Sequence, residues 1–486
     1  MQELLRSKKA ISPILATLLI IVMSVAGIVV TFSWIQGYMG NQFSTVSSSM
    51  LIENVYWYEP NKIDITVRNT GTVALTILNL YIDGLGYDLE QSVKANEADI
   101  ITVEYPWISN QRYKIKVVNT AGLQMEGTYK APDPSEIINW LAGWSNRIQI
   151  TIDSNNIDTM LVDFPLLIFL SNSSLGENHK DVSFIFDELQ DNNKKIALTT
   201  SDGQTQCYTE IEQWNLRDEQ AWLWTKVPTI NNTTDTHLYL YYDADQLDNN
   251  VYVGDSNSAL AQNVWDSDFK LVTHMRDAPD TYHIRDSTLN DNDGTKEWPN
   301  APSQADGQIG KAQEFNRIIS DHVNCGTSSS LEIQNTLTIE AWINPDSLSA
   351  IHQNSIVDRG SSYWFFVFTD GPLAFLRFKG SFGAFSTTAI IPTGTYTHVA
   401  VEYDTFGANE VKLYINGQLS SEGSLDGPID TTSSSVLIGD RSNVHPFDGV
   451  IDEVRISSNC RGAAWIKACF ESGRGTLLNF GNKETT

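Results

Sequence analysis

A long stretch without charge near the start constrains this chain of 486 residues more than any other feature. Lys9 is the last charged residue before Glu53, and residues 11–35 between them are predominantly apolar. About 20 apolar residues in a helix span the hydrocarbon core of a bilayer. The pattern therefore predicts a long hydrophobic α-helix over residues 11–50. The basic residues before it are expected in the cytoplasm, and the rest of the chain outside.

Three interpretations of this segment differ in how it is processed. A secretory signal peptide would be cut after Ala26, whereas a plain membrane anchor would stay uncut. The third interpretation rests on the basic stretch RSKKA followed by ISPILATLLIIV, which resembles the N-terminus of archaeal type IV pilins. That resemblance implies a prepilin-type leader over residues 1–10, cut by a prepilin peptidase between Ala10 and Ile11.

The pilin resemblance also implies partners. A cut before the apolar segment leaves that segment on the mature protein, where other pilin subunits and the pilus assembly machinery can take it from the membrane into a filament. Repeated head-to-tail packing of one subunit builds a helical filament. Small residues such as Ala16 and Gly27 would let the helices approach closely.

Beyond Glu53 the pattern changes to the period-two alternation of β-strands. Residues 62–68 (KIDITVR) alternate apolar and polar side chains, and a turn separates them from the next apolar run at 75–82. This spacing predicts a β-sandwich over residues 51–131. The stretch VRNTGTVALTILNLYIDG resembles the β-domain that follows the helix in archaeal pilins.

Two further β regions follow. Residues 144–250 are predicted to form a small β-sandwich, whose strand order resembles an uncharacterised β-domain of prokaryotic surface proteins. Residues 265–478 resemble a laminin-G-like, concanavalin A-like jelly roll, through the stretches LTIEAWINP, YTHVAVEYD, VKLYINGQ and FDGVIDEVRIS in that order. The expected fold class is therefore mainly β, with an N-terminal long hydrophobic α-helix followed by three β-sandwich or jelly-roll domains.

The net charge excludes one class of partner. The formal net charge is -27, from 59 acidic and 32 basic residues. Such an acidic surface repels phosphate backbones, so nucleic acid is not expected as a partner. Partners of other kinds, such as glycans or proteins of another cell's surface, remain open.

One loop is dense in oxygen ligands for a cation. Residues 286–294 (DSTLNDNDG) resemble the Asp/Asn/Gly loop of laminin-G-like domains, which in some members holds calcium together with the Asp of the IDEVRI strand. The resemblance implies Asp286, Asn290, Asp293 and Asp452 as calcium ligands. The alternative is a polar turn without metal, because Asn, Asp and Gly are common in turns.

No enzyme is expected. The chain has no G-x-S-x-G, HExxH or Walker motif. Jelly-roll glycoside hydrolases carry an E-x-D-x-x-E pattern, and the nearest match, Glu402-Tyr403-Asp404, has Gly407 at the place of the second Glu.

Cysteines and asparagines supply further candidate sites. Cys460 and Cys469 are close in the chain and are candidates for a disulfide, although four cysteines allow three pairings. Candidate N-glycosylation sites are Asn172, Asn231 and Asn232.

Together these observations predict a cell-surface protein whose precursor is inserted in the membrane. The expected function is that of a subunit, or a minor or tip adhesin, of an archaeal type IV pilus-like filament that adheres to glycans or other surface proteins. An uncleaved, membrane-anchored carbohydrate-binding ectodomain is the first alternative. A secreted glycan-active enzyme is the second alternative.

Overall fold

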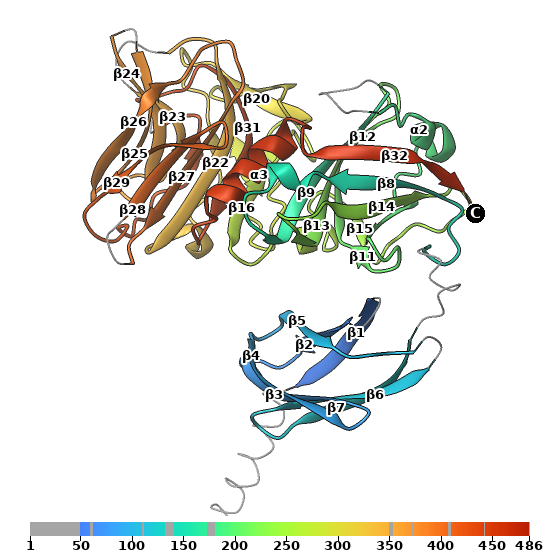
Figure 1. The fold of residues 1–486 in the computed structure, drawn as a ribbon. Coiled ribbons are helices and arrows are strands. Elements are labelled where there is room, and N and C mark those ends of the chain that lie inside the picture. The colour runs from blue at the N-terminus through green and yellow to red at the C-terminus, as the bar shows by residue number, and fades with distance from the viewer. Residues whose placement is uncertain are drawn as a thin grey trace, which may run out of the picture. The chain divides into compact units, whose positions relative to one another are not determined.

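A computed structural model describes most of the chain from residue 49 onward. The described residues are 49–58, 62–108, 111–131, 140–172, 180–348, 353–371, 373–406, 410–441 and 443–485. The predicted leader, the cleavage site at Ala10 and Ile11 and the apolar segment up to residue 48 lie outside them. The chain divides into two compact units, residues 1–138 and residues 139–486. They are called the N-terminal unit and the C-terminal unit (Figure 1).

The predicted fold class needs a correction at its N-terminal end. The described residues are nearly all strand and turn, and strand β1 (Met50–Tyr58) already includes the last residue of the helix expected over 11–50. Within the ranges that the structure describes, no helix is long and apolar enough to cross a membrane. The prediction of a long hydrophobic helix reaching residue 50 is therefore wrong. The physical reason is that Met50 and Ile52 are buried side chains of a strand that pairs with a neighbour.

The N-terminal unit is a sandwich of two antiparallel sheets. The first sheet has the order β1–β2 (Lys62–Asn69)–β5 (Ala98–Glu104). The second has the order β4 (Leu85–Val93)–β3 (Leu75–Ile82)–β6 (Arg112–Asn119)–β7 (Gln124–Lys130). The predicted alternation is present: Ile63, Ile65 and Val67 are fully buried and pack in one core with Ile77 and Leu80.

The C-terminal unit begins with a sandwich that we call the small sandwich. One of its sheets has the order β11 (Gln206–Cys207)–β10 (Ile196–Thr200)–β14 (Thr236–Tyr242)–β8 (Asn146–Ile152)–β32 (Leu478–Thr485). The other has the order β15 (Val253–Asp255)–β12 (Thr209–Asn215)–β13 (Gln220–Ile230)–β9 (Leu161–Ser171). Short helices η1 (Ser154–Asn156) and α2 (Phe184–Leu189) lie between its strands, and η2 (Ala261–Val264) follows its last strand before the jelly roll, β15.

The rest of the C-terminal unit is a jelly roll of two eight-stranded sheets. The sheet that packs against the small sandwich has the order β19 (Ser303–Asp306)–β20 (Lys311–Phe315)–β31 (Gly449–Ser457)–β22 (Thr336–Pro345)–β27 (Thr397–Asp404)–β28 (Glu410–Ile415)–β29 (Gln418–Ser424), with β16 (Phe269–Thr273) beside β31. The other has the order β17 (His283–Ile284)–β18 (Gly294–Lys296)–β21 (Val323–Asn324)–β30 (Leu437–Ile438)–β23 (Gln353–Asp358)–β24 (Trp364–Asp370)–β25 (Leu373–Gly380)–β26 (Gly383–Ile390). Turn η3 (Ser329–Leu331) precedes β22.

The small sandwich and the jelly roll form one compact unit. Strand β32, at the end of the chain, returns to the small sandwich and pairs antiparallel with β8. Helix α3 (Ala463–Gly473) precedes β32 and lies between the two parts (Figure 1). Its Trp465 and Phe470 share one apolar core with Phe164 of the small sandwich and Trp342 of the jelly roll. Because that core is continuous, the two parts are not independent modules.

Candidate functional site

An open pocket lies beside α3 on the jelly-roll sheet that contains β22 and β27. Its volume is about 280 Å³. Three aromatic and three polar side chains line it: Trp342, Tyr396, Phe470, Gln308, Asn416 and Arg474. Binding pockets for small molecules typically combine aromatic walls with a few polar groups that orient the ligand. The composition of this pocket is of that kind.

The alternation of side chains in β22 explains why Trp342 lies on the side of the sheet where the pocket is. Leu337, Ile339 and Ala341 point into the jelly-roll core, so Trp342 points to the opposite face, where α3 packs. There its indole stacks on the ring of Phe470, with centroids 5.7 Å apart and planes at 24°. Tyr396, directly before β27, donates a hydrogen bond from its hydroxyl to the Asp306 carbonyl at 2.6 Å, which fixes the ring.

The polar groups of the pocket are also held in place. Asn416 forms the turn between β28 and β29 with a positive φ of 50°, and its Oδ1 accepts from the backbone N–H of His398 at 3.0 Å. Gln308 donates from Nε2 to the Gly473 carbonyl at 3.1 Å. The guanidinium of Arg474 lies 5.2 Å from the centre of the Phe470 ring. The pocket therefore presents preorganised amide and guanidinium groups next to aromatic rings.

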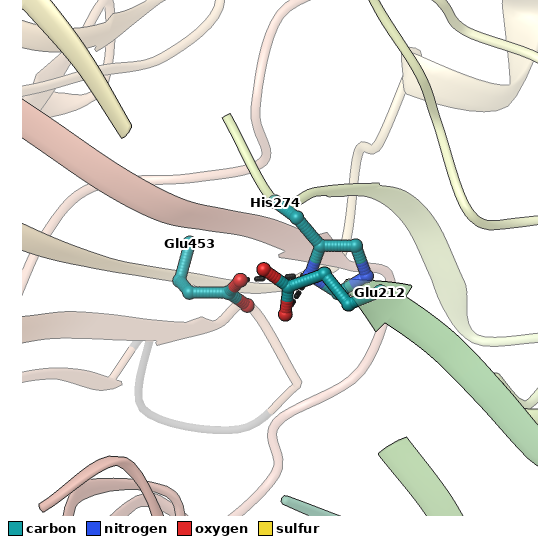
Figure 2. A group of neighbouring side chains, drawn as sticks. All are labelled: Glu212, His274 and Glu453. Carbon is teal, nitrogen blue, oxygen red and sulfur yellow. Dashed lines mark hydrogen bonds and ion pairs between the residues drawn. The ribbon is translucent and has the colours of Figure 1, made fainter. Parts of the chain in front are cut away.

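A second group of polar side chains is buried where the small sandwich meets the jelly roll. We call Glu212, His274 and Glu453 the acid–histidine cluster (Figure 2). His274 Nδ1 lies 2.7 Å from Glu453 Oε1 and 3.6 Å from Glu212 Oε2. All three residues are at most 5% exposed. One ligand atom of each lies within 4.8 Å of the others, so these residues could hold a metal ion.

Each member of the cluster comes from a different strand or strand end. Glu212 lies on β12, where Ile211 faces the core and the glutamates on either side of it face the jelly roll. His274 directly follows β16. Glu453 lies on β31 at a bulge: Glu340 pairs with Arg455 and Trp342 with Asp452, so β31 has one residue more than β22 between these pairs. The φ of Glu453 is 49°, as expected where a bulge redirects a side chain.

The charges of the cluster depend on one another. Burial raises the pKa of Glu212 to about 7, although His274 opposes this. Burial alone would lower the pKa of His274, but Glu453, Glu212 and Glu210 together raise it well above its usual value. Burial alone would raise the pKa of Glu453. The positive charges of His274 and Arg455 outweigh the effect of burial, and the pKa of Glu453 is lowered. In the absence of any other cation, protons on His274 and Glu212 therefore balance the buried carboxylates.

The calcium ligands predicted from the sequence are only partly brought together. Asp286 and Asp293 lie in one loop, and Asp286 accepts hydrogen bonds from the backbone of Val272, Thr288 and Asn292. Asp293 pairs with Arg285 at 2.6 Å.

Each of the other two predicted ligands, Asn290 and Asp452, forms a hydrogen bond with the backbone of another segment. Asn290 donates from Nδ2 to the Phe269 carbonyl at 3.0 Å. Asp452 accepts from the backbone N–H of Ile309 at 2.9 Å, in another segment. Calcium binding by these residues stays a prediction.

The remaining candidate residues are two cysteines and three asparagines. Cys460 and Cys469 are both free thiols, so the bridge considered between them is not present in the structure. Asn172 and Asn232 are exposed and Asn231 is half-buried. Asn172 donates to Glu219 at 2.8 Å. Glycosylation of these three residues stays a prediction.

Sequence reasoning missed the acid–histidine cluster and the pocket. A signal for the cluster exists in TEIEQ, where two glutamates flank a core isoleucine, and in IDEVRI, where two acids stand between core residues. The alternation shows that these acidic side chains lie on the face of the strand opposite the core residues. It does not show that another sandwich covers that face.

The comparisons with known proteins bear on the jelly roll. Residues 318–467 match the laminin-G family model described as the concanavalin A-like lectin/glucanases superfamily. This part of the chain is therefore a laminin-G-like, concanavalin A-like domain, as its four stretches predicted. Among curated proteins none matches the chain.

Several solved structures resemble the chain. Domain 4 of AbnA, a GH43 extracellular arabinanase from Geobacillus stearothermophilus, in complex with arabinotriose, is 25% identical, with 41% of this chain and 98% of that chain covered and a TM-score of 0.34. The binding domain of Paraclostridial Mosquitocidal Protein 1 is 16% identical over 42% of this chain and 52% of that chain, with a TM-score of 0.35. A putative carbohydrate binding protein from Bacteroides ovatus is 14% identical over 71% of this chain and 93% of that chain, with a TM-score of 0.29.

Proposed function

We propose that this chain is a glycan-binding protein of the cell surface, and that the pocket beside α3 is its saccharide site. The observation that carries the proposal is the chemistry of the pocket. A pyranose or furanose ring has apolar C–H faces that pack on aromatic rings and hydroxyl edges that exchange hydrogen bonds with amides and guanidinium groups. The half-buried ring of Tyr396 supplies the first kind of contact, and Asn416 and Arg474 the second.

The same pocket favours binding over catalysis. Its six lining residues include no Asp or Glu. Glycoside hydrolysis ordinarily needs two carboxylates that flank the scissile bond, about 5–9 Å apart. A saccharide held in this pocket would therefore be bound and not cleaved, so the second alternative, a secreted glycan-active enzyme, is not part of this proposal.

The cellular setting in this proposal is a surface filament of the archaeal type IV pilus kind, with the chain as a subunit or a minor or tip adhesin. Support comes from the basic stretch and apolar segment before residue 48 and from the β-sandwich that follows it. The mass of the N-terminal peptide of native protein tests this part. A start at Ile11 supports filament processing. A start at Met1 contradicts it and leaves a glycan-binding ectodomain on an uncleaved anchor.

Glycan binding is tested with the full chain in a detergent without a sugar head group. The chain is first screened on an array of microbial, plant and animal glycans, and the oligosaccharide bound best is then titrated by calorimetry. Tyr396→Ala and Arg474→Ala are each expected to weaken binding about tenfold or more, because a loss of about 1.4 kcal/mol corresponds to a factor of ten.

Two control variants make this result specific. Arg217→Ala removes an exposed arginine on the turn between β12 and β13, outside the pocket, and is expected to leave the affinity unchanged. Trp298→Ala removes an indole that is 82% exposed and could itself hold a sugar. If binding survives the two pocket variants and is lost in Trp298→Ala, the saccharide site is at Trp298 and the pocket assignment is wrong.

A further inference from the structure

One carboxylate oxygen of the acid–histidine cluster is buried and unsatisfied. Glu212 Oε2 accepts from Trp224 Nε1 at 2.8 Å, but Glu212 Oε1 is fully buried and has no hydrogen-bond partner among the described residues. A buried carboxylate oxygen without a partner costs free energy, and such atoms in folded proteins call for an explanation. In Figure 2 the carboxylates of Glu212 and Glu453 lie close together beside the ring of His274.

The surroundings of His274 orient one ring nitrogen toward the two carboxylates. Its Nε2 lies at an ion-pair distance of 3.4 Å from Glu210 Oε1 and has no hydrogen-bond partner among the described residues. Glu210 is itself held by Trp265 Nε1 at 2.7 Å and by the Ser287 hydroxyl at 2.6 Å. In protein metal sites a histidine commonly binds the metal through one ring nitrogen, and a carboxylate often lies at the other nitrogen.

The two carboxylates of the cluster have outer partners as well. Glu453 Oε2 accepts from Arg455 at 2.7 Å, while Glu453 Oε1 faces His274. Trp224 donates to Glu212, as described above, and its ring stacks on His274. Both carboxylates are thus held by hydrogen-bond donors outside the cluster, which limits how they can rotate.

The charges in direct contact also point to a divalent cation. Three carboxylates, those of Glu210, Glu212 and Glu453, lie within 4 Å of His274, and one guanidinium, that of Arg455, pairs with Glu453. With a neutral histidine this set has two negative charges in excess, in a site closed to solvent. Charges buried in this way require compensation by pairing or by a metal.

We infer that Glu212, His274 and Glu453 bind a divalent transition-metal ion such as Zn²⁺. One imidazole nitrogen with two carboxylates is a donor set for such ions, whereas Ca²⁺ takes oxygen ligands only. Because Glu212 belongs to the small sandwich and the other two ligands to the jelly roll, the ion joins the two parts of the C-terminal unit. The role is structural, since all three ligands are buried.

The first test is the metal content of the full chain. The chain is purified in the detergent used above without chelator, passed through a desalting column and analysed by inductively coupled plasma mass spectrometry. About one equivalent of a divalent transition metal is expected in the wild type, and loss of most of it in Glu212→Gln. The amide keeps an acceptor for Trp224 but removes the charged ligand. Asp293→Asn, in the loop predicted to bind calcium, is the matched control and is expected to retain the metal.

A second measurement needs no variant. Wild-type chain stripped with a chelator is unfolded by heat with and without added Zn²⁺, and separately with Ca²⁺. Zn²⁺ is expected to raise the midpoint temperature by about 5 °C, since an ion at a large excess over its Kd adds several kcal/mol of stability, and Ca²⁺ is expected not to do so.

Two results would overturn the inference. One is a wild-type chain that is metal-free as purified and whose midpoint temperature does not respond to Zn²⁺, which would mean that protons alone balance the cluster. The other is a metal content equal in the wild type and in Glu212→Gln, which would mean an adventitious ion only. Neither result bears on glycan binding, because the pocket beside α3 shares no residue with the three ligands.

Discussion

The indole of Trp224 stacks on the imidazole of His274, with ring centroids 5.6 Å apart and planes 17° from parallel. The same indole donates its N–H to Glu212 at 2.8 Å. Trp224 lies on β13 of the small sandwich, and His274 follows β16 of the jelly roll. One side chain thus bridges the two parts of the C-terminal unit by ring contact and by hydrogen bonding.

Trp224→Phe separates these two contributions. The phenyl ring can still pack on His274, but Glu212 loses a donor in a fully buried place. Leaving a buried acceptor unsatisfied costs about 1–3 kcal/mol. We expect the free energy of unfolding, measured with urea and followed by circular dichroism, to fall by about that amount. A change below about 0.5 kcal/mol would show that the hydrogen bond does not stabilise the fold.

The carboxyl of Asp358 gives the stability a defined pH dependence. Burial raises the pKa of Asp358 from 3.8 to about 6, even though Arg441 donates to it at 2.8 Å. The folded chain therefore binds this proton more tightly than the unfolded chain does. The resulting stability is complete below about pH 4 and is lost as the pH rises through 6.

Asp358→Asn removes this titration. Between pH 4 and pH 7 the unfolding free energy of the wild type should fall by about 2.4 kcal/mol more than that of the variant, because most of the difference between the two pKa values is titrated in this range. Urea titrations of both proteins at the two pH values measure the difference. Equal slopes in the two proteins would mean that Asp358 is ionised throughout this range.

Strand β32 should make the C-terminal unit unfold in one step. Phe480 on β32 is 9% exposed and packs in the apolar core that also contains Trp342 and Trp465. We expect Phe480→Ala to cost about 3–5 kcal/mol, as for other buried phenylalanines. Amide exchange measured by mass spectrometry should then accelerate in β8 and in β22 alike. Faster exchange confined to β8 would contradict a single cooperative unit.

The cysteines offer a test of the bridge considered from the sequence. All four are free in the structure, and burial raises the pKa of Cys460 and of Cys207 to about 12. At pH 8 the native chain should therefore react slowly with iodoacetamide, beginning at the half-buried Cys460. After unfolding in guanidinium without reductant, four labelled thiols are expected. Labelling of Cys207 and Cys325 alone would show a bridge between Cys460 and Cys469.

Strands whose one face is buried could be predicted from the sequence because their side chains alternate. The stretches KIDITVR and LTIEAWINP are strands β2 and β22 nearly as predicted, and the match of residues 318–467 confirms the laminin-G-like domain. The expected end of the helix at Met50 is wrong, because an uncharged residue such as Met50 also suits the first position of a strand. There, pairing with β2 decides the structure.

The parts that escaped prediction depend on contacts between distant segments. Strand β32 pairs with β8 across more than 300 residues, and nothing in its own pattern indicates a partner. The acid–histidine cluster joins Glu212, His274 and Glu453, and the bulge that places Glu453 depends on the pairing of β31 with β22. A local pattern can indicate that an acidic side chain points away from the core of its own sheet. Only the packing of the two sandwiches determines which residues that side chain contacts.

If the chain holds a ligand beside α3, as proposed, the pairing of β8 with β32 has a mechanical consequence. Asn146 at the start of β8 is opposite Thr485, and Ile152 at its end is opposite Leu478. A pull on the chain before Asn146, resisted by a ligand held next to α3, acts on the opposite ends of this strand pair. The pair is then loaded in shear, so that its hydrogen bonds bear the force together and do not open one after another as in a zipper.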